Sequence, residues 1–467
     1  ALASFVCEPS LTSLGGGGFL NAYTASGEAL LFDFFVQTPG QRHPVEEMDF
    51  VASQINFGTT VQPQYIGRGS AAVPGCPAGI WEAHQRLGRL PFTRIIEPAL
   101  RLCREGVHIT PYQAYTISIL ESVLLDDPES RAIFAPKGQL IRAGEWMYRP
   151  LLADTLDAYA REGARLFYEG EIGQRFAADN AARGGSVSLA DLMAYQVHLR
   201  APLRRAYRDY TLLTNPAPSA GGSMIAAGLS LLSGRPLQGH HPRGEAYVHL
   251  LAQVMQGMEA YRKGPLQTGP AEGDTFVQQW QARLDWLGNT TQISVLDAEG
   301  NAASLTTTLG GASGRNIPGT GVPTNNMLGE LDLHPEGYYR WTPNQRVQSM
   351  MSPSVVLHEG QPVFALGSGG SSRIRTAVLQ VLVNLIDHGM HPEDAVLHPR
   401  LHWEHGVLNL EPGLIEHPHL LRWDDAKVIL WHEPNMFFGG VHLVGRDRKG
   451  RLLGVGDARR DGAWGGA

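Results

Sequence analysis

The segment that decides the fold and the chemistry reads Asn289-Thr290-Thr291-Gln292-Ile293-Ser294-Val295. It follows a polar stretch rich in Gly and Pro and opens a predicted pair of strands, 291–296 and 302–309, joined by a turn at 297–301. A threonine hydroxyl is a weak nucleophile unless a base adjoins it, and an N-terminal threonine supplies that base with its own α-amine. This chemistry requires prior cleavage of the 289–290 peptide bond. In an uncut chain, Thr290 is an ordinary first residue of a strand.

The composition is that of a folded chain with a large core. Of 467 residues, 43% are hydrophobic and only 18% are charged, which excludes intrinsic disorder. The formal net charge of −7 provides no basic field, so we expect no binding to nucleic acid or to an acidic membrane surface. No stretch approaches the ~20 apolar residues of a membrane-spanning helix. The three cysteines lack CxxC spacing and predict neither a disulfide framework nor a zinc ribbon.

Length alone allows one large domain or two or three ordinary ones. The chain starts at Ala1 without an initiator methionine, so we expect some N-terminal residues to be missing from it. A signal peptide is therefore neither found nor excluded. A cytoplasmic location and a periplasmic or secreted location both stay open.

Apolar periodicity and turn residues predict strands first, then helices, then strands and one more helix. The predicted features are strands within 11–40, helices at 79–87, 92–103, 151–159 and 223–232, a capping box at Ser188–Asp191, a short helix ending near Gly288, strands at 291–296, 302–309, 355–357 and 363–366, a helix at 373–388, and strands within 437–457. In this order, strands and helices do not alternate in regular β-α-β units. The order favours an α+β fold, with helices outside antiparallel sheets, over a Rossmann fold.

Several other patterns give weaker indications of a site. The glycine run 15–18 opens a strand rather than a helix and lacks the lysine of a phosphate loop. Five histidines within 388–405 have no HExxH spacing, so we predict no metal site there. Neither a GxSxG elbow nor an acid pair for glycoside chemistry is evident. The small residues of Gly367-Ser-Gly-Gly-Ser-Ser372 precede a helix and expose backbone N–H groups, the geometry of an oxyanion hole.

Taken in order, these segments resemble the γ-glutamyltranspeptidase family of N-terminal-nucleophile (Ntn) hydrolases, and the resemblance covers almost the whole chain. Thr290-Thr291-Gln-Ile-Ser294 is similar to the family's Thr-Thr-His-aromatic-Ser, in which the first Thr is the nucleophile. The other matching blocks are Glu8-Pro9 with Gly15–Phe19, Val73–Gly79, Leu87-Gly88 with Leu90-Pro91, Pro98-Ala99, Arg104–Gly106, Phe167–Gly170, Pro216–Gly222 and Asp457–Gly462.

The resemblance implies that autoproteolysis exposes Thr290 and leaves a large-subunit segment, 1–289, and a small-subunit segment, 290–467. Together they would form one αββα domain, a four-layer sandwich with two stacked antiparallel sheets between helical layers. The resemblance implies no cofactor and no metal. The partners it implies are a small-molecule amide substrate and the two self-processed subunits; whether these form a homodimer stays open.

Four further residues match the family's catalytic and binding positions. Thr308, the last residue of Thr306-Thr-Thr308, matches the threonine that hydrogen-bonds the nucleophile. Gly370 and Ser371 match the pair whose backbone N–H groups form the oxyanion hole. Ser349 matches the first of two substrate-binding serines.

The sequence departs from the family at four positions of the substrate pocket. Phe35 stands where an arginine clamps the substrate α-carboxylate, and Glu330 stands where an aspartate binds the α-amino group. Met350 replaces the second substrate-binding serine, and Gly310 replaces the asparagine that follows the threonine matched by Thr308 by two residues. The segment 326–346 is also short compared with members that carry a lid loop.

We therefore expect a γ-glutamyltranspeptidase-like amidohydrolase or acyltransferase with an altered acyl pocket and poor activity on γ-glutamyl substrates. This expectation fails if a neighbouring arginine, Arg346 or Arg373, takes over the clamp. The same family pattern also fits an oxamate-type, cephalosporin-acylase-like or C–C-cleaving hydrolase, and it fits an uncleaved, non-catalytic member. The sequence leaves open which acyl group is recognised and whether it passes to water or to an amine.

Overall fold

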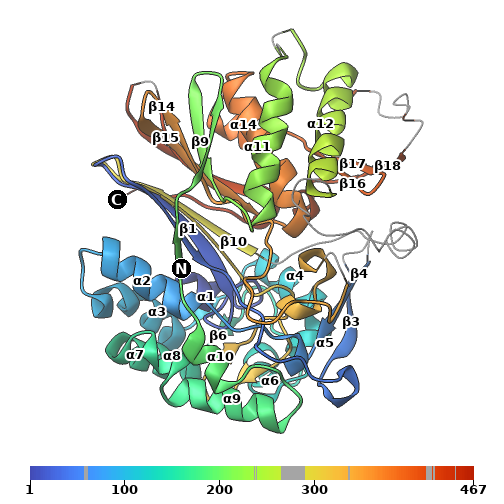
Figure 1. The fold of residues 1–467 in the computed structure, drawn as a ribbon. Helices are drawn as coiled ribbons and strands as arrows, with labels where there is room; N and C mark the ends of the chain where they lie inside the picture. Colours follow the sequence, from blue (N-terminus) through green and yellow to red (C-terminus); the bar gives the residue numbers. More distant parts are fainter. Residues whose placement is uncertain are drawn as a thin grey trace.

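Two antiparallel sheets form the centre of the fold, and helices pack against each of them (Figure 1). The computed structural model describes residues 1–56, 61–235, 237, 239–263, 290–334, 337–416, 423, 426–447 and 449–466. The mixed α and β content and the antiparallel pairing confirm the α+β class expected from the order of the predicted elements.

The first sheet has five strands, which run in the order β10 (Thr290–Leu296), β11 (Ala302–Thr308), β1 (Gly17–Tyr23), β2 (Ala29–Phe34) and β7 (His198–Arg200). Strands β10 and β11 form the hairpin predicted around the turn at 297–301, and β11 also pairs with β1. The sheet therefore joins strands from the first half of the chain to strands that follow residue 289.

The second sheet has six strands, in the order β20 (Leu452–Val455), β19 (Gly440–Arg446), β15 (Gln361–Gly369), β14 (Ser354–His358), β9 (Tyr210–Thr214) and β8 (Leu203–Tyr207). It too combines strands from before and after residue 289. Strands β10 and β11 contact β15, and Gly369 at the end of β15 lies against the Thr290 carbonyl at the start of β10.

Each sheet is in contact with helices. Helix α14 (Ile374–Ile386) packs on β15 and β19, and α11 (Ala220–Ser233) lies between α14 and α12 (Glu245–Lys263) (Figure 1). Helix α14 is apolar on nearly every side because it is enclosed by a sheet and by another helix. On the other sheet, α2 (Cys76–Leu87) packs on β1 and β2, and α3 (Phe92–Glu105) pairs with α7 (Pro150–Glu162).

The structure confirms the predicted helices and strands within the described residues, with boundaries that shift by a few residues. Ser188 and Asp191 form the predicted capping box. The short helix expected near Gly288 lies outside the described residues. The sequence did not predict α12, the antiparallel pair of β3 (Val51–Asn56) and β4 (Val61–Ile66), or the small sheet of β16 (Leu401–Glu404), β17 (Val407–Leu410) and β18 (Lys427–Leu430). No helix in the described part of the chain has the length and apolarity needed to cross a membrane.

Candidate active site

Thr290 begins β10 and lies opposite Thr308 on β11. The Thr290 hydroxyl donates to Thr308 Oγ1 at 3.3 Å, and Thr308 Oγ1 also accepts from the Gly310 N–H at 3.0 Å. The next residue, Thr291, faces the other way along the strand, and its hydroxyl donates to Glu8 Oε2 at 2.7 Å. Of the two adjacent threonines, only Thr290 lines the cavity described below.

The glycine-rich end of β15 approaches Thr290 from the second sheet. A Cβ atom at Gly369 would lie 2.3 Å from the Thr290 carbonyl oxygen, so only glycine permits this approach. The chain then turns through Gly370, with φ of +126°, and Ser371, with φ of +50°. Among the described residues, neither the Gly370 N–H nor the Ser371 N–H has an intramolecular acceptor. The turn beside Thr290 thus offers two backbone donors, as its small residues predict.

A cavity of about 20 Å³ lies between the two threonines and this turn. It has room for about one water molecule. It is lined by Phe35, Thr290, Thr308, Gly310, Met327, Glu330, Asp332, Leu333, Ser349, Met350, Met351, Ser371 and Ile374. Eight of the nine site residues predicted from the sequence are in this set, and the ninth, Gly370, precedes Ser371. Within the described ranges, the lining contains two carboxylates and no arginine, lysine or histidine.

Glu330 and Gly310 fit one another. Glu330 Oε1 accepts from the Gly311 N–H at 2.7 Å, and Asn326 Oδ1 accepts from the same N–H at 2.7 Å. A Cβ atom at Gly310 would lie 2.4 Å from Glu330 Oε1 and 2.3 Å from Asn326 Oδ1. Burial, aided by the neighbouring Asp332 carboxylate, raises the pKa of Glu330 to about 7. The longer acid therefore occupies space that a side chain at position 310 would need.

Phe35 is buried and stacks on Phe19, with ring centroids 5.6 Å apart. Arg346 does not replace a clamp here, because its guanidinium pairs with Asp33 at 3.4 Å, lies 4.7 Å over the Tyr195 ring and donates to the Phe35 carbonyl. The apolar ring and the occupied arginine give this wall of the cavity no positive charge from the residues that the structure describes.

Arg373, the other arginine considered for the clamp, is fully buried beneath the turn. Its guanidinium lies 4.4 Å over the Phe437 ring and donates to Ser372 Oγ at 2.9 Å. It is not part of the cavity lining. Neither arginine named in the sequence analysis therefore reaches the cavity.

Ser349 and Met350 lie on a segment fixed by the loop before α11. Ser219 Oγ donates to the Ser349 carbonyl at 3.0 Å, and a Cβ atom at Gly221 would lie 2.0 Å from the Met350 carbonyl oxygen. Ser349 Oγ accepts from the Met351 N–H at 3.1 Å. The Met350 side chain is buried and adds apolar surface to the cavity.

Five residues of the lining, Asp332 and four apolar ones, were not predicted from the sequence. No motif in the sequence marks Asp332 as a site residue. The apolar residues Met327, Leu333, Met351 and Ile374 carry no signal that distinguishes a pocket wall from an ordinary core. Their places become evident only from the packing of segments far apart in sequence.

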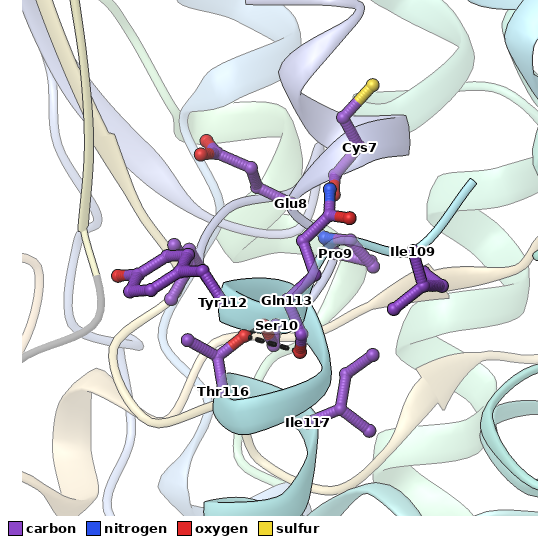
Figure 2. A pocket seen from close by; sticks show the side chains of 10 residues that line it. Cys7, Glu8, Pro9, Ser10, Ile109, Tyr112, Gln113, Thr116 and Ile117 are labelled. Atoms are coloured by element: carbon purple, nitrogen blue, oxygen red, sulfur yellow. Dashed lines mark hydrogen bonds between the residues drawn. The ribbon is translucent and has the colours of Figure 1, made fainter. Parts of the chain in front are cut away.

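The cysteines and histidines do not form a competing site in the described part of the chain. Burial raises the pKa of Cys103 to about 11 and that of Cys7 above its ordinary value, so both stay thiols at neutral pH. Figure 2 shows the small cavity beside Cys7, of about 10 Å³, where Ser10 Oγ donates to Thr116 Oγ1 at 3.4 Å and the thiol points away from that pair. Among the residues with described positions, His, Cys, Asp and Glu side chains form no group of three that could hold a metal ion.

Known proteins share both the sequence pattern and the fold. A family model described as gamma-glutamyltranspeptidase matches residues 1–282 and 265–467. The chain is 32% identical over 484 aligned residues to the acylase ACY 1 proenzyme of Pseudomonas sp. (strain SE83), covering 98% of this chain and 86% of that protein. It is 28% identical to the glutathione hydrolase proenzyme of Escherichia coli (strain K12), covering 90% and 79%.

Two solved structures have the same fold over much or all of this chain. A cephalosporin acylase from Bacillus halodurans superposes with a TM-score of 0.83 at 23% identity, covering 100% of this chain and 90% of that one. The Helicobacter pylori gamma-glutamyltranspeptidase superposes with a TM-score of 0.52 at 26% identity, covering 60% and 80%.

Proposed function

The chain is an enzyme of the γ-glutamyltranspeptidase family, and we propose from this that it is an Ntn amidohydrolase with Thr290 as its nucleophile. The observation that carries the proposal is the position of Thr290. Its hydroxyl is hydrogen-bonded to Thr308, its carbonyl lies against Gly369, and it lines a cavity bounded by Ser371.

In the proposed reaction, the 289–290 bond is cut first, which gives Thr290 a free α-amine. Thr290 Oγ then attacks the carbonyl carbon of the substrate amide, and the α-amine takes the hydroxyl proton. The oxyanion of the tetrahedral intermediate accepts hydrogen bonds from the Gly370 and Ser371 N–H groups. The C–N bond breaks, and the amine product leaves with the proton. Water hydrolyses the acyl-enzyme and restores Thr290.

Processing divides the chain into a large segment, 1–289, and a small one, 290–467. Two of the relatives named above are called proenzymes, which supports maturation by cleavage. We place both segments in one αββα sandwich, in which the two antiparallel sheets are the middle layers. The contacts of α2 with β1 and β2, and of α14 with β15, support helical outer layers.

The acyl group accepted by the site is proposed to differ from a standard γ-glutamyl group. An α-carboxylate needs a cation, and the ionisable groups of the described cavity lining are two acids, Glu330 and Asp332, neither of which can supply a positive charge. Phe35 and Met350 make the remaining walls apolar. An acylase of this family is therefore favoured over a glutathione hydrolase, in keeping with the 32% identity to the Pseudomonas acylase.

Mass analysis and N-terminal sequencing of the purified protein test the nucleophile. We expect two fragments, the smaller starting at Thr290, and hydrolysis of acyl amides. Thr290→Ala should stay uncut and inactive, whereas Thr290→Ser should keep some cleavage and turnover because a hydroxyl with an adjacent amine survives. Thr291→Val is the matched control, since it removes the neighbouring hydroxyl that contacts Glu8. A new N-terminus other than Thr290, or a fully active Thr290→Ala, would remove the proposed nucleophile.

A further inference from the structure

Ser371 holds a backbone conformation that costs free energy for any residue with a side chain. Its φ of +50° lies in the left-handed region, where glycine is favoured and serine is uncommon. The preceding Gly370 is also at positive φ, so the turn contains two consecutive residues outside the usual regions. Such a turn persists only if surrounding contacts hold it.

The contact that holds Ser371 comes from Asp332. Ser371 Oγ donates to Asp332 Oδ2 at 2.9 Å. The other carboxylate oxygen, Oδ1, lies 3.2 Å from Arg262 Nη1, and Arg262 Nη2 donates to the Asp332 carbonyl at 2.7 Å. Side-chain exposure is only 6% for Asp332 and 17% for Arg262. The carboxylate is thus fixed on one side by α12 and binds the turn on the other.

We propose that Asp332, held by Arg262, is a positioning residue that keeps Ser371 in its left-handed conformation, so that the Gly370 and Ser371 N–H groups stay aimed at the reacting carbonyl oxygen. The inference rests on the proposed function, because the turn matters for catalysis only if it binds an oxyanion. A serine at this position compensates for its backbone strain with a side-chain hydrogen bond that glycine cannot make.

The competing role for Asp332 is direct binding of a positively charged group on the substrate, since Asp332 also lines the cavity. The geometry favours positioning, because both carboxylate oxygens are already engaged, one by Ser371 and one by Arg262. A substrate amine would have to displace one of these partners. The two roles predict different effects of Asp332→Ala when position 371 is glycine.

A double-mutant cycle separates them. Asp332→Ala in the full, processed protein should lower kcat by about 10-fold or more while KM for an uncharged acyl anilide changes little, because a misplaced oxyanion donor acts on the transition state. Ser371→Gly should also lower kcat, since the turn loses its hydrogen bond to Asp332. In the Ser371→Gly background, however, Asp332→Ala should change kcat by less than about 2-fold, because no serine is left to position. Equal effects of Asp332→Ala in both backgrounds would overturn the proposal.

Two further variants distinguish a loss of positioning from a general loss of folding. Arg262→Gln, which loosens Asp332 and changes a residue that is not itself in the cavity lining, should repeat the same non-additivity with Ser371→Gly. Asp387→Asn is the matched control: Asp387 pairs with Arg208 at 2.9 Å at the C-terminal end of α14, whereas the turn lies before the N-terminal end, so kcat should be unchanged. An additive Arg262→Gln effect would count against the proposal in the same way.

Failure of the proposed function has a different signature. Wild-type protein that is neither cut at 289–290 nor active on acyl amides would contradict the proposed function. Crystal structures of the wild type and of Asp332→Ala then decide the positioning role by themselves. Ser371 is expected to leave the left-handed region when Asp332 is removed. An unchanged φ at Ser371 in Asp332→Ala would overturn the inference, whatever the activity.

Discussion

Thr308→Ala is the substitution whose effect follows most directly from the geometry of the site. The Thr308 hydroxyl accepts from Thr290 Oγ1 at 3.3 Å and from the Gly310 N–H at 3.0 Å. Alanine removes both contacts and leaves the strand pairing of β10 and β11 intact. Thr290 then loses the partner that orients its hydroxyl, and the Gly310 N–H loses an acceptor in a buried place.

Each of these losses has its own magnitude. A hydrogen bond of about 1.4 kcal/mol that acts on the nucleophile corresponds to a loss of about 10-fold in rate. The orphaned Gly310 N–H should cost about 1–3 kcal/mol of folding stability, which is the desolvation penalty of an unpaired donor. The rate loss should appear in acyl-enzyme formation, measured by single-turnover kinetics, and the stability loss in the urea midpoint.

Two controls make the result interpretable. Thr308→Ser keeps a hydroxyl and should retain most of the acylation rate. Thr307→Ala removes a buried hydroxyl on the same strand, one that accepts from Thr12 at 2.8 Å, and should lower stability without lowering the rate. The reasoning is refuted if Thr308→Ala acylates at the wild-type rate, or if Thr307→Ala slows acylation by as much.

Three other predictions concern the acyl pocket. With Phe35 in the pocket, kcat/KM for a γ-glutamyl anilide should fall below ~10⁴ M⁻¹s⁻¹ and below the value for a simple acyl anilide; a higher value would mean that a clamp survives. Because the folded-state pKa of Glu330 lies near 7, above its ordinary value of 4.5, folding stability should decrease as pH rises from about 4.5 to about 7. Glu330→Gln should remove this pH dependence, which amounts to up to about 3 kcal/mol of folding stability at 1.36 kcal/mol for each pH unit between the two pKa values. Urea titrations of both proteins at pH 5 and pH 8 measure it, and an unchanged pH dependence in Glu330→Gln would contradict the prediction. Gly310→Ala should destabilise the fold by about 3 kcal/mol, because the residue has a φ of +69° and its new Cβ atom would clash with Glu330. The loss should be smaller in a Glu330→Asp background, and equal losses in the two backgrounds would exclude steric coupling between the two positions.

The sequence predicted the parts of the site that depend on local order. Strands β10 and β11 form a hairpin across a short turn, so the pairing of Thr290 with Thr308 follows from a few adjacent residues. The turn at Gly370 and Ser371 follows from small residues between a strand and a helix. The family resemblance then joined these separate segments into one site.

The sequence could not predict contacts between distant segments. Ser371 and Asp332 are 39 positions apart, Arg262 and Asp332 are 70 apart, and Thr291 and Glu8 are 283 apart. No periodicity or motif links such residues, because their meeting depends on how the sheets and helices pack. In the sequence, Glu330 and Gly310 are two separate departures from the family pattern, and only their positions in the fold show that they fit one another.

The mixed origin of both sheets has a consequence for the two fragments that cleavage would produce. Strand β1 lies beside β11, and β9 lies beside β14, so each fragment completes the hydrogen bonding of the other. The two fragments could not separate as folded units, because their separation would break both sheets and expose the core. Their association would be as strong as the fold itself, so dilution should not release either one. Active enzyme should assemble from separately produced fragments only if the two fold together.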